Sequence, residues 1–333
     1  MTEFVGAEAR LQSEMESESR LAAGDSERSA QGARPGGDDE SAAAKRLSRK
    51  RLIFRRFKRN RSAVVGLYIY GFLLVFAFAG THIAKWSYSQ IDRGEYLKSP
   101  SGSHWFGTTQ AGRDLFAMTV HGLQKSMLIG LTVAVFSTTL AAIVGSFAAY
   151  FGGFIERTSL WVIDLLLVLP SFLLIAIVMT GRGGRGGGVW PLIILITLFN
   201  WMLSARVVRS LTQSIKDRDY VRAAKYMGVR GPTIVFRHII PNISSLLIID
   251  ATLNVAAAVL AETTLSFFGF GIQSPDTSLG TLIADGQTKV TTFPWIFVAP
   301  SVFLVLMVAA INFVGDGLRD ALDPSSLAGG KAA

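Results

Sequence analysis

The 333-residue sequence contains no cysteine, which excludes disulfide bonds, thiolate metal sites and a cysteine nucleophile. Four histidines, His82, His104, His121 and His238, are scattered without the spacing of metal ligands. The pattern G-x-x-x-x-G-K-[ST] occurs nowhere in the chain, so it has no P-loop with which to bind and hydrolyse a nucleotide. Charged residues are scarce, at 17%, whereas 50% of the residues are hydrophobic. This composition is typical of a membrane protein.

The net charge of +9 is concentrated in one segment. Residues 1–44 carry four basic and ten acidic side chains with few aromatics, and we expect a disordered cytoplasmic tail there. Residues 45–61 then carry ten basic side chains and no acidic one, directly before an apolar run. Basic residues beside a membrane span anchor it on the cytoplasmic side, because anionic headgroups attract them. A nucleic-acid interface would need aromatic interleaving or a recognisable module, and neither is present.

Six apolar windows reach or approach the length of about 20 residues that a helix needs to cross a bilayer. They are residues 63–83, 126–151, 160–179, 189–208, 243–270 and 293–314. Six spans place both termini on the same side of the membrane. Residues 206–237 carry eight basic and two acidic side chains, which assigns this loop and both termini to the cytoplasm.

We therefore predict an all-α membrane protein with cytoplasmic termini. Its expected parts are a tail at 1–44, a basic juxtamembrane segment at 45–62, a transmembrane domain at 63–320 with a cytoplasmic loop at 209–242, and a tail at 321–333.

The loop contains the segment DYVRAAKYMGVRGPTIVFRHIIPN, residues 219–242. Residues 217–227 favour a helix with acidic side chains at its start and good helix formers after them. On this helix Val221, Ala224 and Gly228 share a face on which small residues allow another backbone to approach closely. Gly228 is suited to end the helix, a second short helix can begin after Gly231, and Pro241 is expected to break the chain before the fifth span.

The same segment resembles the cytoplasmic signature of permease subunits of ATP-binding-cassette importers: E-A-A, three residues, Gly, nine residues, Ile, one residue, Leu-Pro. Arg222, Ala223, Ala224, Gly228, Ile240 and Pro241 fall at this spacing. The match departs from the signature at Arg222, which replaces its Glu, and at His238, which replaces its Ile. The change at Arg222 removes any polar contact that the acidic side chain would make.

Longer blocks make the resemblance more specific, to the C-type subunit of dipeptide, oligopeptide and nickel permeases, over residues 54–325. The blocks are FRRFKRNRSAVVG, FGTTQAGRDLF, YFGGFIERTSLWVIDLLLVLPSFLL, RDYVRAAKYMGVRGPTIVFRHIIPN and LAETTLSFFGFGIQSPDTSLG. Thr109 stands where these proteins usually have an acidic residue. The resemblance implies the type I permease fold, with six transmembrane helices in a prokaryotic cytoplasmic membrane.

The resemblance also implies a non-catalytic subunit. A second, B-type permease would share the translocation path, two ATPase subunits would bind the ATP and Mg²⁺, and an extracytoplasmic binding protein would deliver peptides. No cofactor is expected in this chain. Residues 220–230 would then seat in a groove of an ATPase subunit. The expected ATPase-coupling residues are Tyr220, Arg222, Ala223, Ala224, Gly228, Val229, Arg230 and Pro241.

Several acidic residues fall within or beside the apolar windows, where a charge is costly. We expect Glu262, with Asn254 on nearly the same face, to line or gate the translocation path; the alternative is a structural pairing with another helix or the backbone. Asp164 and Asp250 are expected in ion pairs nearer the cytoplasmic side. Pro170 and Pro300 can each kink their helix.

Three alternative functions follow from the same sequence. The architecture could import nickel or another small solute. An ion-driven secondary carrier would act without ATPase subunits, but matched Gly/Pro interruptions in two halves of the chain are lacking. An intramembrane enzyme would need a catalytic motif such as H-E-x-x-H, which is absent. Dependence on separate ATPase subunits distinguishes the first of these from the other two.

Overall fold

The computed structural model describes residues 49–181 and 188–322. The chain divides into two compact units, Met1–Leu52 and Ile53–Ala333, and the first contributes only residues 49–52 to the described part. The predicted tail at 1–44 and nearly all of the predicted tail at 321–333 lie outside the described residues.

The described residues form helices and contain no strand, apart from two isolated β-bridges. The elements are α3 (Arg49–Arg59), α4 (Arg61–Ile83), α5 (Leu115–Phe151), α6 (Gly153–Val168), α7 (Ser171–Thr180), α8 (Val189–Ile215), α9 (Asp219–Tyr226), α10 (Gly231–Ile234), the π-helix η1 (Val235–Ile239), α11 (Ile240–Phe267), α12 (Leu279–Gln287) and α13 (Pro294–Leu322).

Five helical stretches in this part of the chain are long and apolar enough to cross a membrane, and the bent pair α6 and α7 brings the number to six if it counts as one span. The six predicted windows each fall on one of these stretches. Two helices extend beyond their windows because they continue into polar sequence. α5 begins at Leu115 rather than at residue 126, and α8 ends at Ile215 rather than at residue 208.

The third window is wrong as a single straight span. Its helix breaks at Leu169 and Pro170, and α6 and α7 meet there at an angle of 76°. Proline has no N–H to continue the helical ladder, and its ring disfavours helical geometry at the preceding residue. Leu169 accordingly has an extended backbone. The predicted kink at Pro170 is confirmed, and the break is larger than a kink.

The predicted break at Pro241 is also wrong. α10, η1 and α11 form one continuous helical stretch from Gly231 to Phe267. Pro241 is the second residue of α11, where the wider turn of η1 precedes it and the N–H of Ile240 bonds to the carbonyl of Val235. A π-turn offsets the register of the helix, so the missing N–H of the proline is tolerated. The second short helix predicted after Gly231 is therefore the first turn of the fifth span.

Glycines bring the long helices close together. A Cβ on Gly145 of α5 would lie 2.5 Å from the carbonyl oxygen of Ala205 on α8. A Cβ on Gly130 of α5 would lie 2.6 Å from Cγ2 of Val259 on α11. Small residues at such crossings are the usual basis of helix packing in membranes. α5 therefore forms the centre on which α8 and α11 pack.

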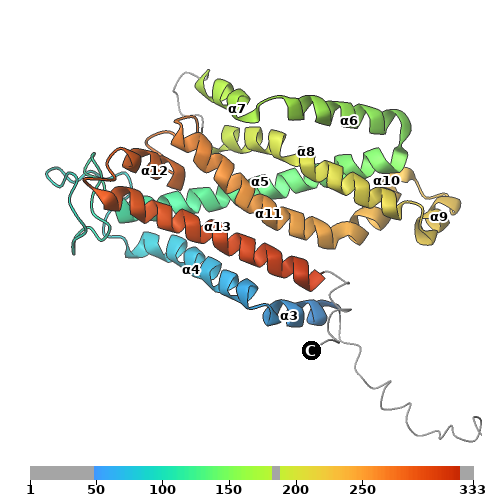
Figure 1. Ribbon diagram of the computed structural model, residues 1–333, viewed down its shortest axis with the longest axis horizontal. Helices are drawn as coiled ribbons and strands as arrows, with labels where there is room; N and C mark the ends of the chain where they lie inside the picture. The colour runs from blue at the N-terminus through green and yellow to red at the C-terminus, as the bar shows by residue number, and fades with distance from the viewer. Residues whose placement is uncertain (1–48, 182–187, 323–333) are drawn as a thin grey trace, which may run out of the picture. The chain divides into compact units, whose positions relative to one another are not determined.

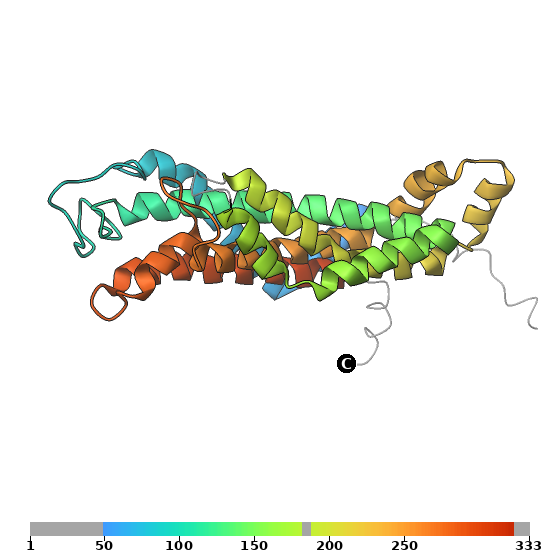
Figure 2. The same cartoon turned by 90° about the horizontal axis from the view of Figure 1, so that it is seen from above.

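Figure 1 shows α9 and α10 at one end of the bundle and α12 at the other, and Figure 2 shows the same separation from above. We call these the α9 end and the α12 end. Residues 84–114 lie at the α12 end and hold buried His104, whose Nδ1 is 2.8 Å from Asp114 Oδ2. Asp114 also caps α5 by accepting a hydrogen bond from the N–H of Ala117 at 2.7 Å.

Candidate functional site

The helix α9 begins and ends as its sequence predicts, within two residues. Asp219 occupies the first turn, where its negative charge is favourable. At the other end the N–H of Gly228 bonds to the carbonyl of Lys225, and the N–H of Val229 bonds to that of Ala224, both at 3.1 Å. This pair of bonds is a Schellman motif, which requires a left-handed residue, and Gly228 has φ +77°. The helix is therefore ended sharply, with a fixed direction for the chain that follows.

One face of α9 is buried against the chain itself. Val221 and Ala224 are 2% and 1% exposed. They belong to a core cluster with residues of α8, α10, η1 and α11: Val208, Ile215, Ile234, Val235, Ile239 and Ile243. Val221 and Ala224 thus accommodate the protein's own helices. Gly228 differs from them, because a Cβ added to it would meet no atom within 4 Å. Close packing against α10 and η1 holds α9 rigidly at the end of the bundle.

The remaining predicted coupling residues lie largely on the outer surface. Tyr220, Arg222, Ala223, Gly228, Arg230 and Pro241 are exposed, Val229 is half-buried and Ala224 is buried. The hydroxyl of Tyr220 accepts a hydrogen bond from the side-chain amide of Asn242, which ties the start of α9 to the start of α11. The structure thus brings the predicted residues together in one protrusion.

Two residues of this surface were not singled out by their sequence. Tyr226 and Met227, at the tip of α9 beside Gly228, are 88% and 76% exposed. Large apolar side chains this exposed on a polar loop indicate a contact with another molecule. The one feature of the sequence that could have indicated their exposure is their position directly before Gly228, at which the chain turns away from α9.

A basic pocket of about 720 Å³ adjoins α9. The cationic side chains of Lys216, Arg222 and Lys225 line it, with one acidic residue, Asp217. The aromatic rings of Tyr150 and Phe151 at the end of α5, together with Val221, Tyr226 and Gly231, complete the lining. Such a concentration of positive charge favours an acidic partner surface.

The structure does not bring Asn254 and Glu262 together. Asn254 is half-buried and donates hydrogen bonds to Asp250, at 2.9 Å, and to Ser204, at 3.1 Å. Glu262 is fully buried and accepts hydrogen bonds from the hydroxyls of Ser126, at 3.1 Å, and Ser266, at 2.6 Å. Glu262 has no exposed surface on this chain, whereas Asn254 has.

Buried Glu262 connects three elements near the α12 end. Its partner Ser126 lies on α5 and also accepts a hydrogen bond from the N–H of Leu279, which begins α12, at 3.4 Å. Its partner Ser266 accepts one from the N–H of Ile272 at 3.2 Å. The contacts match the structural pairing that we considered as the alternative for this residue.

The acidic residues expected in ion pairs have different environments. Asp164 on α6 forms an ion pair with Arg206 on α8, as expected. Asp250 was expected in an ion pair nearer the cytoplasmic side, and the expected ion pair is wrong. No ion pair among the described residues includes it, and it lies 17 residues before Phe267, the last residue of α11.

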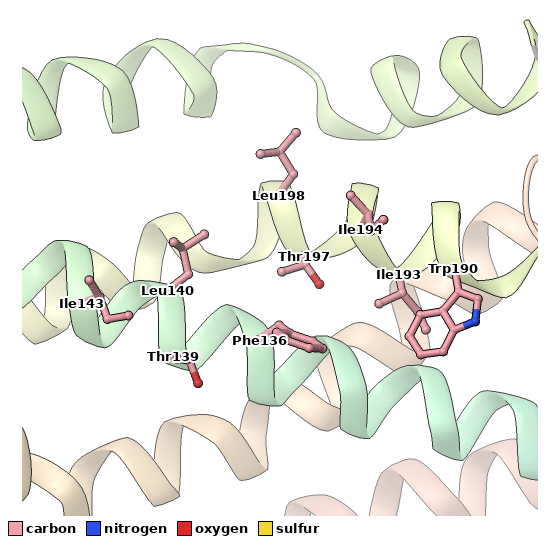
Figure 3. A pocket seen from close by; sticks show the side chains of 9 residues that line it. All are labelled: Phe136, Thr139, Leu140, Ile143, Trp190, Ile193, Ile194, Thr197 and Leu198. Atoms are coloured by element: carbon pink, nitrogen blue, oxygen red, sulfur yellow. The ribbon is translucent and has the colours of Figure 1, made fainter.

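An apolar groove of about 500 Å³ lies between α5 and α8. Figure 3 shows its lining, which comes from both helices: Phe136, Thr139, Leu140, Ile143, Trp190, Ile193, Ile194, Thr197 and Leu198. The hydroxyl of Thr139 already donates to the carbonyl of Val135 at 2.7 Å. A groove with so few polar groups suits hydrocarbon and offers little to a polar solute. In the described ranges, no three histidine, aspartate or glutamate side chains gather where a metal could bind.

Known proteins resemble this chain along most of its length. Residues 137–327 match the family described as "Binding-protein-dependent transport system inner membrane component", and residues 48–100 match the "N-terminal TM domain of oligopeptide transport permease C". One solved structure, of the inward-facing MetNI methionine ABC transporter, has a TM-score of 0.49 and 18% identity, and covers 62% of this chain and 96% of its own. That likeness is too weak to support an argument.

Curated relatives are much more similar. The oligopeptide transport system permease protein OppC of Mycobacterium tuberculosis is 53% identical over 84% of this chain and 96% of its own length. The protein of the same name from Bacillus subtilis is 34% identical over 86% of this chain and 93% of its own length. The dipeptide transport system permease protein DppC of Bacillus subtilis is 36% identical over 81% of this chain and 84% of its own. The chain is therefore a multi-pass membrane protein that belongs to the family of binding-protein-dependent transport system inner membrane components.

Proposed function

We propose that this chain is a permease subunit of an ATP-driven importer that takes up dipeptides and oligopeptides into a prokaryotic cell. It would share the translocation path with a second, B-type permease subunit in the cytoplasmic membrane. Two separate ATPase subunits would bind ATP and Mg²⁺ at the α9 end, on the cytoplasmic side. A peptide-binding protein would deliver the substrate at the α12 end. The names of the curated relatives support the choice of peptides.

The observation that carries this proposal is the rigid protrusion at α9. Its inner face is buried, its exit is fixed by Gly228, and its tip exposes Tyr226 and Met227. A rocking motion of the permease driven by a separate ATPase requires a rigid element that transmits the movement of the ATPase to the membrane helices. Tyr220, Arg222, Ala223, Gly228, Val229, Arg230 and Pro241 would form this ATPase-coupling surface, while Ala224 would support it from beneath.

Arg222 gives the coupling surface an unusual charge for the signature that it resembles. Because Arg222 lies in the basic pocket with Lys216 and Lys225, we expect an acidic residue in the groove of the ATPase subunit that receives α9. For the translocation path, we place Asn254 on its wall because this polar residue is half-buried within the span. Glu262 would act on the path indirectly, by fixing α5, α11 and α12 relative to one another.

The proposal is tested by uptake of labelled di- to pentapeptides into proteoliposomes that contain the full transporter and its binding protein. We expect uptake to require ATP and the ATPase subunits. Met227→Asp places a charge in the apolar contact and should abolish uptake, while Met227→Leu keeps an apolar side chain and should support it. Uptake without ATPase subunits would contradict the proposal in favour of an ion-driven carrier. ATP-driven uptake of a nickel chelate but of no peptide would change only the substrate.

A further inference from the structure

Asp250 is an acidic side chain within a membrane-spanning helical stretch. The stretch runs from Gly231 to Phe267, and Asp250 lies about 25 Å from its α12 end at 1.5 Å per residue. Placing a carboxylate inside an apolar span is costly, and such residues in membrane proteins usually serve a substrate or ion pathway. The cost must be offset by the groups around it.

The groups that donate hydrogen bonds to Asp250 in the described structure are all neutral. Ser204 on α8 donates to Oδ1 at 2.9 Å, and Thr138 on α5 and Asn254 on α11 donate to Oδ2 at 3.3 and 2.9 Å. None of the ion pairs formed by the described residues includes this carboxylate. Three hydrogen bonds leave at least one of about four acceptor positions of a carboxylate open. The site thus retains both an uncompensated negative charge and room for a donor.

The cluster is partly open to the surface of the chain. Asp250, Asn254 and Asn200 are half-buried, and Asn200 donates to the side-chain oxygen of Asn254 at 3.5 Å. Polar groups on a lipid-facing surface would be unsatisfied, so this face of α8 and α11 meets protein or water.

We propose that Asp250 binds the α-ammonium group of a peptide as it passes through the transporter, with the amides of Asn254 and Asn200 beside it to bond the peptide backbone. The inference rests on the proposed peptide import. A peptide with a free N-terminus carries this ammonium whatever its side chains, so a single carboxylate can serve many sequences. An ammonium supplies both the missing positive charge and a hydrogen-bond donor, and charge-assisted hydrogen bonds of this kind are the strong ones.

The first test measures ATP-driven uptake of labelled tri-alanine by the complete reconstituted transporter. Asp250→Asn keeps the shape and removes the charge, and we expect uptake to fall by about tenfold or more. Asp250→Glu keeps the charge and should recover part of the uptake. Asp316→Asn is the matched control, because Asp316 is an exposed carboxylate on α13 outside the cluster, and its uptake should stay within about twofold of wild type.

The second test uses the unaltered transporter, so it does not depend on how a variant folds. A hydrophobic carbodiimide added during turnover should join the amino group of tri-alanine to the Asp250 carboxylate as an amide, with loss of water to the carbodiimide. Mass spectrometry should find the added peptide on the fragment that contains Asp250. N-acetylated tri-alanine, which has no amine, should give no product.

The outcomes separate this inference from the function on which it rests. Wild-type transporter that imports no peptide would contradict the proposed function itself. Normal peptide uptake by Asp250→Asn would contradict only the ammonium site. A carbodiimide product that links Asp250 to a lysine of the second permease, and not to tri-alanine, would also overturn the ammonium site. The positive partner of Asp250 would then be a protein side chain with a structural role.

Discussion

The carboxylate of Glu262 on α11 accepts a hydrogen bond from the hydroxyl of Ser126 on α5, 136 positions earlier in the chain. The same hydroxyl accepts from the N–H of Leu279 at the start of α12. A single buried group thus fixes the relative positions of three helices. A Cβ on nearby Gly280 would lie 2.8 Å from the backbone of Thr263, so α12 sits directly against α11.

Replacing Glu262 should therefore affect stability in a way that depends on hydrogen bonding rather than on charge. Glu262→Leu leaves the hydroxyls of Ser126 and Ser266 without their acceptor, and we expect a loss of about 1–2 kcal/mol. Glu262→Gln should cost less, because its oxygen still accepts and serine hydroxyls can rotate to accept from its amide. SDS-induced unfolding of the purified subunit measures both. Equal losses for the two variants would show that the charge itself is required.

Asp276, in the connection between α11 and α12, should make stability depend on pH. Burial raises the pKa of its carboxyl, but hydrogen bonds from Lys125 and His121, both at 2.7 Å, and from the N–H of Thr277 outweigh burial and hold the pKa below its usual 3.8. Because the folded pKa lies below the unfolded one, the stabilisation is complete above pH 3.8 and is lost as pH falls through the folded value.

The check compares the thermal stability of wild type and Asp276→Asn from about pH 6 to about pH 3. The wild type should be more stable by a constant margin down to about pH 4, and the margin should shrink below that. A margin that stays constant or widens on acidification would contradict the assignment of the pKa shift to the folded state.

How much of this fold the sequence predicts depends on whether a feature is local. Apolar length located every span, and Pro170 marked the break between α6 and α7, because both signals lie within one segment. The ends of α5 and α8 were missed since these helices continue in polar sequence that hydropathy does not detect. The break predicted at Pro241 failed because the local rule for proline ignores the π-turn of η1 before it.

The candidate sites show the same difference between local features, which the sequence predicts, and features that depend on several segments. Gly228 was predicted to end α9 from its type and position, and its backbone conformation confirms this. The close approach predicted on the face of Val221 and Ala224 is confirmed by their burial, but the sequence does not say that α10 and η1 cover it. The environment of Asp250 is built from α5, α8 and α11, and the sequence does not say which side chains of three helices will meet.

The adjacent alanines of α9 provide a matched pair for the predicted coupling surface. Glu at position 224 would bury a carboxylate without a counter-ion at a site that is 1% exposed, so Ala224→Glu should destabilise the docking of α9 by several kcal/mol. Ala223→Glu puts the same group on the exposed face and should leave the fold intact. Limited proteolysis at the α9 end reports local unfolding. Equal protease sensitivity of the two variants would contradict the burial pattern.

Gly228 allows a test of whether coupling requires the exact exit from α9. Its φ of +77° suits glycine, is tolerated by Asn and is strained for a β-branched residue. Space is not limiting, since nothing lies within 4 Å of an added Cβ. Gly228→Asn should therefore retain most ATP-driven uptake, while Gly228→Val should lose about 1–2 kcal/mol of local stability and most of the uptake. Uptake is compared at equal amounts of assembled complex, so that only the effect of the backbone change is measured. Full uptake by Gly228→Val would contradict the prediction and show that the contact at α9 tolerates a displaced tip.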